Sequence, residues 1–415
     1  MIKIISDVEV VQQKAGFRFT EKLLQATQSH DRRPTIPVLL VLEDGTELLM
    51  VREIEKGNML QVNCKLPVVF YHPYFLLDNK TRDMVPPSLA AAIKTRAEAS
   101  KICCDEGLVY AVYEQLTQHF SVEMIGRGRF VQGQVYRTSC QEVVSRFYTN
   151  QSSVDKAAFA LTERMANGSR IREMLGQGGS DTRFTSLTEL MAKEGLDAVV
   201  ASSPLAVMEL AGYPACGIGA PELLAIYQQG ENEVIVFTPC SRTGQELEEL
   251  GFRPAGQMSL VELLKDKRVG FEEDSLDVAT YLLLAESCEL KKASGLLRLW
   301  RESKLGSKDL AYFVLTASAS KYAVEKTMAY AADKVRQQEN LTEADLYRLY
   351  QDLVQKFVRE EQIPVPIEIY FTNLHAGIRS PYPAVPSNHP VNRDGKTHKM
   401  DAGLMVLDGP RLMHA

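Results

Sequence analysis

The residues best able to do chemistry gather at the C-terminal end of this chain. Four of the seven histidines lie in the last forty-one residues: His375, His389, His398 and His414. An apolar run over 403–407 then leads into Asp408 and a Gly-Pro turn. A carboxylate at the end of a buried strand, nineteen residues after the His389 imidazole, is typical of a hydrolytic metal site.

Two helices and two strands must position these side chains. Apolar residues at helical spacing predict a long helix over about 308–338, and a second helix begins near Thr342, with Asp345 at the capping-box distance. A strand over 367–371 precedes the histidine-rich loop. The final strand is apolar on both faces, as a covered strand requires. We therefore expect Asp408 on a central strand, its carboxylate facing a concave surface near the His389 loop.

Composition and charge exclude several classes of protein. A net charge of −6 over 415 residues argues against a nucleic-acid partner, which would require a basic face. There is no run of eighteen apolar residues, so we expect no membrane span. The first residues lack the apolar core of a signal peptide. The seven cysteines show no CxxC spacing and are interpreted as reduced thiols of a cytoplasmic protein.

The length predicts two to three domains. We expect an α/β domain over 1–167, a second α/β domain over 181–300 and a third domain over 301–415. The glycine-rich joint at 176–180 indicates a linker, because a phosphate-binding loop would need a strand before it and Lys-Ser or Lys-Thr after it. Helices that alternate with strands in the second range predict a largely parallel, covered sheet.

Two pairs of segments resemble each other within the chain. Segments 153–162 and 307–316 match at six of ten positions, and hairpin patterns occur at 37–51 and 223–238. The segments are either two amphipathic helices with similar starts or the product of a duplicated unit of sheet plus exit helix. Duplication predicts that the first domain is related to the second, that the hairpins are equivalent, and that 153–165 is the exit helix.

Several motifs in the second and third ranges occur in an order that resembles a known family, the creatinases, prolidases and aminopeptidases P. They are Met191-Ala-Lys-Glu-Gly-Leu-Asp-Ala-Val-Val-Ala-Ser-Ser-Pro, then Glu209-Leu-Ala-Gly-Tyr, the exit from Leu299-Trp-Arg to Asp309, the helix start at Leu341-Thr-Glu, and the interval from His389 to Asp408. The resemblance covers roughly residues 183–415. It implies an α/β and α+β multidomain protein, with one or two creatinase-N-like α/β domains followed by the first half of a pita-bread fold.

The resemblance also implies an activity: a metal-dependent hydrolase of the Xaa-Pro aminopeptidase or dipeptidase type, acting on a peptide or small amide with two divalent ions of manganese, cobalt or zinc. Asp408 matches the family's first metal-ligand aspartate. His389 matches its substrate-binding histidine, which stabilises charge on the scissile carbonyl, although Tyr382 would fill that position if the loop aligns differently. We interpret His375 and His398 as loop histidines without a role. Relatives are usually dimers, so a homodimer is expected.

The chain departs from the family pattern in ways that affect function. The family binds its metals through two aspartates, one histidine and two glutamates, and only Asp408 has a counterpart here. The second aspartate would follow about eleven residues later, beyond Ala415, and one carboxylate holds no dinuclear centre. We therefore expect these 415 residues to be an inactive, truncated part of a longer hydrolase, or to be completed by a second chain. The alternative is a non-catalytic relative that binds a peptide or protein.

Overall fold

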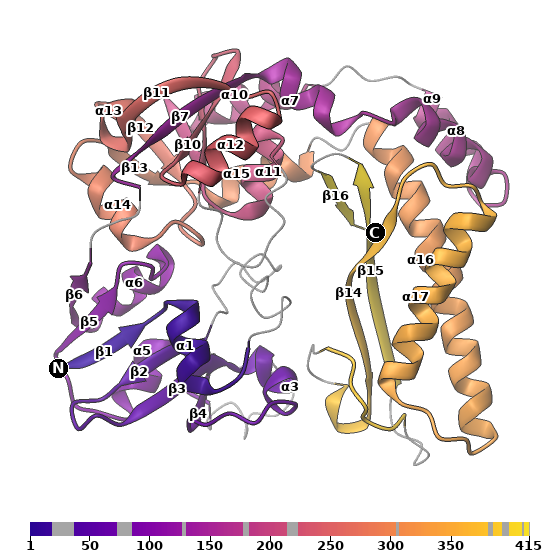
Figure 1. Cartoon of the computed structure of the whole chain (residues 1–415), viewed down its shortest axis with the longest axis horizontal. Helices are drawn as coiled ribbons and strands as arrows, with labels where there is room; N and C mark the ends of the chain where they lie inside the picture. The colour runs from indigo at the N-terminus through magenta and orange to yellow at the C-terminus, as the bar shows by residue number, and fades with distance from the viewer. Residues whose placement is uncertain are drawn as a thin grey trace. The chain divides into compact units, whose positions relative to one another are not determined.

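The chain forms two compact units in a computed structural model (Figure 1). The structure describes residues 1–18, 37–72, 85–126, 130–176, 182–213, 223–303, 307–380, 385–391, 398–408 and 411–414. Unit 1 combines Met1–Cys140 with Phe184–Trp300, and unit 2 combines Gln141–Arg183 with Arg301–Ala415. The predicted domain ranges 1–167, 181–300 and 301–415 stay predictions. Except for Gly176, the linker predicted at 176–180 lies outside the described residues.

The first sheet of unit 1 has the strand order β4-β3-β2-β1-β5-β6. Its strands are β1 (Ile2–Ile5), β2 (Val38–Val41), β3 (Glu47–Arg52), β4 (Val68–Tyr71), β5 (Lys101–Asp105) and β6 (Ser121–Ile125). Its helices are α1 (Val8–Ala15), η2 (Glu53–Glu55), α3 (Lys56–Met59), α5 (Leu89–Lys94) and α6 (Tyr110–Thr117). The predicted hairpin is confirmed: β2 and β3 pair antiparallel, Gly45 turns the chain at φ +85°, and Asp44 accepts the Thr46 N–H at 2.9 Å.

The second sheet of unit 1 has the order β11-β7-β10-β9-β8-β12-β13. Its strands are β7 (Gln132–Ser139), β8 (Ala198–Ala201), β9 (Leu224–Gln228), β10 (Glu233–Thr238), β11 (Arg253–Ser259), β12 (Arg268–Phe271) and β13 (Glu289–Lys292). The helices are α10 (Arg183–Glu194), α11 (Pro204–Ala211), α12 (Ser241–Glu249), α13 (Leu260–Leu264), α14 (Val278–Ala285) and α15 (Ser294–Ser303). The sheet is mixed, because β9 is antiparallel to both of its neighbours, whereas a largely parallel sheet was predicted. The β9–β10 hairpin accounts for one of these two pairings, because its short turn returns the chain antiparallel.

The two sheets repeat one topology. Strand β1 is antiparallel to β2 and parallel to β5, and β8 has the same relation to β9 and β12. The pairs β5–β6 and β12–β13 are parallel and lie at corresponding edges. The hairpins β2–β3 and β9–β10 therefore occupy equivalent positions, as duplication predicts. The equivalent helices α6 and α14 begin beside each other, where Val109 and Asp277 form an antiparallel bridge.

In each sheet, a carboxylate at the end of a strand, or just after it, accepts hydrogen bonds from the start of a helix: α11 in the second sheet and α1 in the first. Glu272, which follows β12, accepts the N–H groups of Ser202 and Ser203, both at 2.7 Å, and the Ser203 hydroxyl at 2.8 Å. Ser203 is the N-cap of α11. At the equivalent place in the first sheet, Asp105 accepts the N–H of Ser6 at 2.6 Å and that of Asp7, the N-cap of α1, at 2.9 Å. This shared contact is further support for duplication.

Two segments of the predicted first domain, β7 and α8 (Gln151–Thr162), belong to structures other than the first sheet. Strand β7 is antiparallel to β10 and β11 and lies between them, so it completes the second sheet. Helix α8, which contains most of the predicted exit helix, belongs to unit 2 and packs against α16 (Ser307–Arg336). The two similar segments 153–162 and 307–316 therefore lie in neighbouring helices. They share a detail: Thr162 and Thr316 each donate to the carbonyl three residues earlier.

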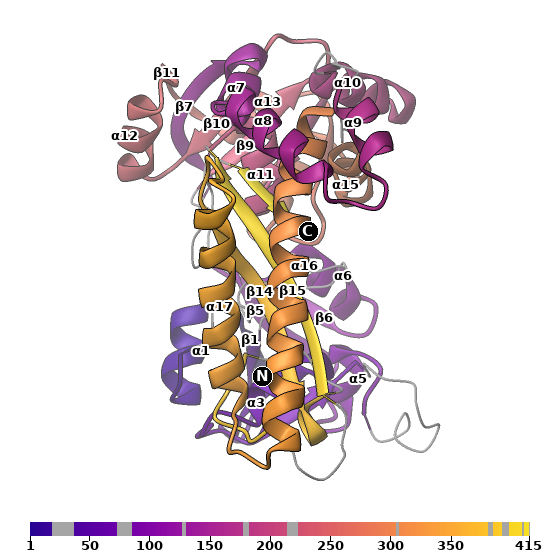
Figure 2. The ribbon, with the colours of Figure 1, turned by 90° about the vertical axis from the view of Figure 1, so that its right-hand side faces the viewer.

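Unit 2 is a layer of helices on a three-stranded antiparallel sheet. The sheet has the order β14 (Ile367–Ala376), β15 (His398–Asp408) and β16 (Arg411–His414). Helix α16 packs against β15, and α17 (Glu343–Glu360) packs against β14 (Figure 2). Helices α7 (Cys140–Phe147), α8 and α9 (Gly168–Gly176) precede them in the chain, and η3 (Gly377–Arg379) follows β14. None of the described helices combines the length and apolar composition needed to span a bilayer.

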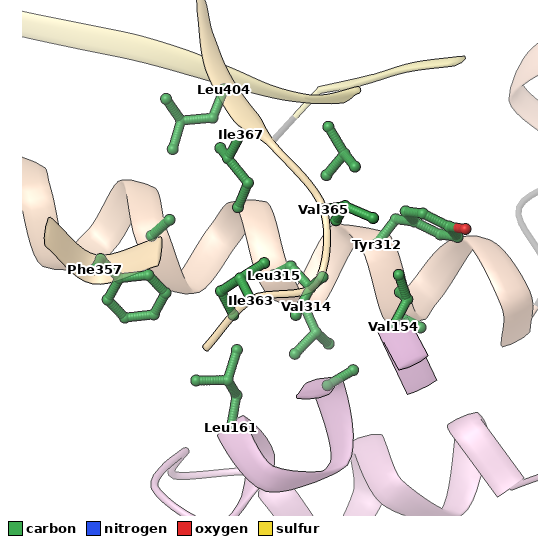
Figure 3. Close-up of a cluster of buried hydrophobic side chains, with 14 of the residues drawn as sticks. Val154, Leu161, Tyr312, Val314, Leu315, Phe357, Ile363, Val365, Ile367 and Leu404 are labelled. Atoms are coloured by element: carbon green, nitrogen blue, oxygen red, sulfur yellow. The ribbon is translucent and has the colours of Figure 1, made fainter. Parts of the chain in front are cut away.

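A hydrophobic core joins the helices of unit 2 to one face of its sheet (Figure 3). Alternate strand residues supply the sheet side, with Ile367, Leu404 and Val406 all at most 1% exposed. The helices contribute side chains at helical spacing, which are Val154, Ala158 and Leu161 from α8, Ala311, Tyr312, Val314 and Leu315 from α16, and Tyr350, Val354 and Phe357 from α17. The predicted helix at 308–338 and the capping box of Thr342 and Asp345 are both confirmed.

We predict that Glu272→Gln destabilises unit 1 by about 1–3 kcal/mol, because one amide oxygen replaces two carboxylate oxygens that satisfy buried donors. Urea unfolding followed by the fluorescence of Trp300, the only tryptophan, measures this. The matched control is Glu289→Gln, which removes a carboxylate that is 70% exposed and pairs with Arg268, and it should change the unfolding free energy little. Equal effects of the two substitutions would contradict the role of Glu272.

Candidate functional site

Asp408 is the last residue of β15, the central strand of its sheet, as predicted. Its backbone pairs with Arg411 of β16. Asp408 lies at the same end of the sheet as the pair formed by Ile367 and Val406. The assignment of Asp408 as a metal ligand stays a prediction.

His389 lies at the other end of the same sheet. The N–H of Glu343 donates to the His389 carbonyl at 3.1 Å, and the Glu343 carboxylate accepts the N–H of Ala376 at 3.0 Å. Ala376 pairs with His398, the first residue of β15. A strand of eleven residues is about 33 Å long. The expectation that Asp408 faces the His389 loop is therefore wrong.

The reason is that both strands are longer than the sequence suggests. Strand β14 was predicted to end at 371 but continues to Ala376, and β15 begins at His398 rather than at Gly403. The residues in these extra strand segments pair with each other across the β14–β15 ladder. Asn373 lies opposite Asp401, and His375 lies opposite Lys399. Asn373 also donates to the Asp401 carboxylate at 3.3 Å. This pairing satisfies the backbone N–H and C=O groups of these residues, so they do not interrupt the strands.

His375 and His398 are not loop histidines, which corrects the interpretation from the sequence. His375 lies within β14 and is completely buried. His398 opens β15 and is partly buried. Both therefore belong to the sheet, and both lie close enough to Glu343 to interact with it electrostatically.

Glu343, a residue that sequence reasoning passed over, is the centre of this end of unit 2. Its carboxylate is completely buried. One oxygen accepts the Ala376 N–H at 3.0 Å and lies 3.8 Å from Nδ1 of His375. The other oxygen accepts the N–H and the hydroxyl of Ser387, both at 3.1 Å, and lies 3.4 Å from Nη1 of Arg379. These residues, with His398, form what we call the Glu343 cluster.

The loop 385–391 is held against the start of α17 by backbone hydrogen bonds. The N–H groups of Glu343 and Ala344, which have no partner within the helix, donate to the carbonyls of His389 and Ser387 at 3.1 and 2.9 Å. The N–H of Val391 donates to the Leu341 carbonyl at 2.8 Å. The main chain of His389 is thereby fixed, and its own N–H donates to the Ser387 hydroxyl at 3.1 Å.

The surroundings of Glu343 keep it ionised. Burial acts to raise the pKa of this carboxyl, but the interaction with His375, the hydrogen bond from Ala376 and the charge of Arg379 outweigh it and lower the pKa below its usual 4.5. The position of Glu343 in the first turn of α17 favours negative charge as well. Arg379 is only 5% exposed, so the pair is a buried ion pair with added hydrogen bonds.

The described residues do not fit a dinuclear metal centre. Within these ranges, no three side chains of histidine, cysteine, aspartate or glutamate are placed to hold a metal ion. Tyr382 and the turn at 409–410 lie outside the described residues, and His414 is placed only as part of β16. The described cysteines, which are 64, 103, 104, 140, 240 and 288, form no disulfide.

We predict that Glu343→Gln destabilises unit 2 by about 3 kcal/mol at neutral pH, because it leaves Arg379 buried without its counter-ion. Because the pKa of Glu343 is lowered from 4.5, the stability it contributes is complete above about pH 4.5 and is lost as the pH falls through the folded value. The difference between variant and wild type should shrink in that acid range. Urea unfolding followed by circular dichroism at several pH values measures both effects.

The control is Glu360→Gln on the same helix, which removes a carboxylate that is 55% exposed and lies 3.6 Å from Lys356. It should leave the unfolding free energy almost unchanged. A Glu343→Gln protein as stable as this control would show that the cluster contributes nothing.

Comparison with known proteins agrees with the resemblance seen in the sequence. Residues 183–303 match the Creatinase/Prolidase N-terminal domain. The X-prolyl aminopeptidase of Caenorhabditis elegans, a cytosolic enzyme with a di-nuclear active site, aligns with 98% of this chain at 10% identity and a TM-score of 0.52. The Pyrococcus furiosus prolidase aligns with 53% of this chain and 65% of its own, at 15% identity and a TM-score of 0.36. No curated protein sequence matches the chain.

The chain covers 64% of the length of the aminopeptidase. The expected fold class, creatinase-N-like α/β domains followed by part of a pita-bread fold, is confirmed by the domain match and by this likeness. Residues 183–303 therefore form a Creatinase/Prolidase N-terminal domain, and the chain shares its fold with an X-prolyl aminopeptidase.

Proposed function

We propose that this chain is part of a metal-dependent hydrolase of the Xaa-Pro aminopeptidase or dipeptidase type. The observation that carries the proposal is the fold shared with an X-prolyl aminopeptidase along 98% of the chain, together with the family domain at 183–303. The substrate would be a peptide or small amide, and the protein would be a cytoplasmic homodimer. The reported location and di-nuclear site of the aminopeptidase are consistent with this proposal.

Of a two-metal centre, these 415 residues would supply Asp408 alone. Asp408 lies far from His389, so the two residues do not form one site within this chain. We retain Asp408 as the proposed metal ligand and propose His389 as a substrate contact only secondarily. A divalent pair, when bound, would polarise the scissile carbonyl and activate water. The remaining ligands would have to come from residues other than those described.

The direct experiment reads the coding sequence beyond Ala415 and expresses the longer product. The proposal expects an aspartate about eleven residues after Asp408, followed by a histidine and two glutamates, and cleavage of an Xaa-Pro dipeptide with added manganese or cobalt. An in-frame stop codon at Ala415 would contradict it.

In that longer product, we predict that Asp408→Asn lowers activity by more than about 100-fold, because a metal ligand loses its charge. Metal analysis should show fewer bound ions per chain. Asp401→Asn is the matched control, since Asp401 lies in the same strand and is exposed. Its activity should stay near that of the wild type, and an equal loss in both variants would remove Asp408 from the proposed site.

For the 415-residue protein itself, we predict that 1 mM manganese or cobalt raises the melting temperature by no more than about 2 °C. A single carboxylate binds such ions weakly, and weak binding contributes little free energy to the folded state. Differential scanning fluorimetry with and without EDTA measures the shift. A large rise would show that the metal site has been misplaced.

A second candidate function is a non-catalytic relative that binds a peptide or protein. The observation that favours it is the separation of His389 from Asp408, which in one active site would have to lie together. In this case the longer product would bind an Xaa-Pro peptide without cleaving it. Isothermal titration combined with product analysis separates the two functions.

A further inference from the structure

The Glu343 cluster contains three groups that can carry positive charge around one buried carboxylate. Arg379 and His375 lie 3.4 and 3.8 Å from Glu343, and His398 opens the strand that pairs with Ala376. With both imidazoles neutral, the charges of Arg379 and Glu343 cancel. Each further proton leaves an excess positive charge away from water, where such charge is costly.

His398 is poorly placed to accept a proton. Its Nε2 atom is buried and has no hydrogen-bond partner within the described part of the chain. A protonated imidazole donates from both ring nitrogens, so charging His398 would leave a buried donor unsatisfied. Burial lowers the pKa of His398, Glu343 opposes that effect, and His375 adds to it.

The other charged groups on the neighbouring elements do not supply the missing negative charge. Lys399 lies opposite His375 in the β14–β15 ladder and adds positive charge. Asp345 accepts hydrogen bonds from Thr342 and pairs with Arg348. The other nearby carboxylates also have partners: Asp401 accepts a hydrogen bond from Asn373, Glu339 pairs with Lys334, and Asp333 pairs with Arg336. The loop itself carries one further imidazole, that of His389. The N-terminus of α17 also disfavours positive charge.

We propose that the Glu343 cluster is an acid-sensitive clasp that holds the loop 385–391 on the start of α17 at neutral pH and releases it when its imidazoles become protonated. The loop is the element that can yield, because Ser387 attaches its middle to the Glu343 carboxylate and only Val391, near its end, is buried, in a small core with Leu341, Leu346 and Leu374. The strands and the helix also contribute to the larger core of unit 2. Release of the loop would expose Arg379, whose Nη2 donates to the Val385 carbonyl at 2.8 Å, and the Glu343 carboxylate that interacts with His398.

The lowered pKa values of His398 and Glu343 agree with a clasp that opens as the pH falls. Because the pKa of His398 in the folded protein lies below 6.5, the stability of the closed state is lost as the pH falls below about 6.5. Glu343 keeps its charge through that range, since its own pKa lies below 4.5. The clasp would therefore open through the imidazoles, before its carboxylate is neutralised.

Amide hydrogen exchange tests the proposal on the 415-residue protein at pH 7.5 and pH 5.5, after correction for the intrinsic exchange rate. The amides to follow are those of Ser387, His389 and Val391, each of which donates a hydrogen bond in the closed loop. Their protection should fall roughly tenfold at the lower pH, because pH 5.5 lies one unit below the ordinary imidazole pKa of 6.5, so that protonation favours the open state about tenfold. Amides of β9 and β10 in unit 1 should stay protected.

His398→Gln should remove most of this fall, because glutamine does not titrate. The matched control is His119→Gln, an exposed imidazole of unit 1 whose Nδ1 lies 3.3 Å from Lys94 Nζ, and it should keep the wild-type pH response. Unchanged loop protection in the wild type at pH 5.5 would overturn the proposal, as would a full response in a folded His398→Gln protein. If that variant fails to fold, the wild-type profile and an NMR titration of its imidazoles still decide the matter, because the loop must open with the titration of His398.

Discussion

A carboxylate removed from water must be met by several donors, and this requirement organises both units. In unit 1, the buried Glu272 joins the end of β12 to the start of α11, and the partly buried Asp105 joins β5 to α1 in the same way. In unit 2, Glu343 joins the start of α17 to β14 and to the loop 385–391. Most of the donors are backbone N–H groups, whose positions depend on the fold. Each contact can therefore form only when segments distant in the sequence are correctly arranged.

Features with local causes could be predicted from the sequence. The turn at Asp44 and Gly45 and the capping box of Thr342 and Asp345 depend on residues a few positions apart, and both are present. The importance of Glu343 could not be predicted, because its partners lie between thirty-two and forty-four residues away. The one available signal was a glutamate in the first turn of a helix followed by an Arg- and His-rich stretch, and that signal is weak on its own.

The ends of β14 and β15 show why the candidate site was only partly predictable. Three of the four residues from Thr372 to His375 are polar, which is typical of the start of a loop. Pairing across the ladder satisfies their backbone, and their polar side chains face groups such as Asp401. A partner that lies some twenty-five residues away is invisible to local patterns. The longer strands carry the His389 loop and Asp408 to opposite ends of the sheet, so two residues near in sequence are distant in space.

The repeated topology of unit 1 is interrupted at one position in the second sheet. Strand β11 runs in the same direction as β10, just as β4 runs parallel to β3, but β7 separates β11 from β10. An inserted strand must come from another part of the chain, and here it comes from the segment that follows the first sheet. The family domain at 183–303 thus has a sheet completed by residues outside the match. Strand β7 and the bridge between Val109 and Asp277 both join the two sheets, which lie together in unit 1.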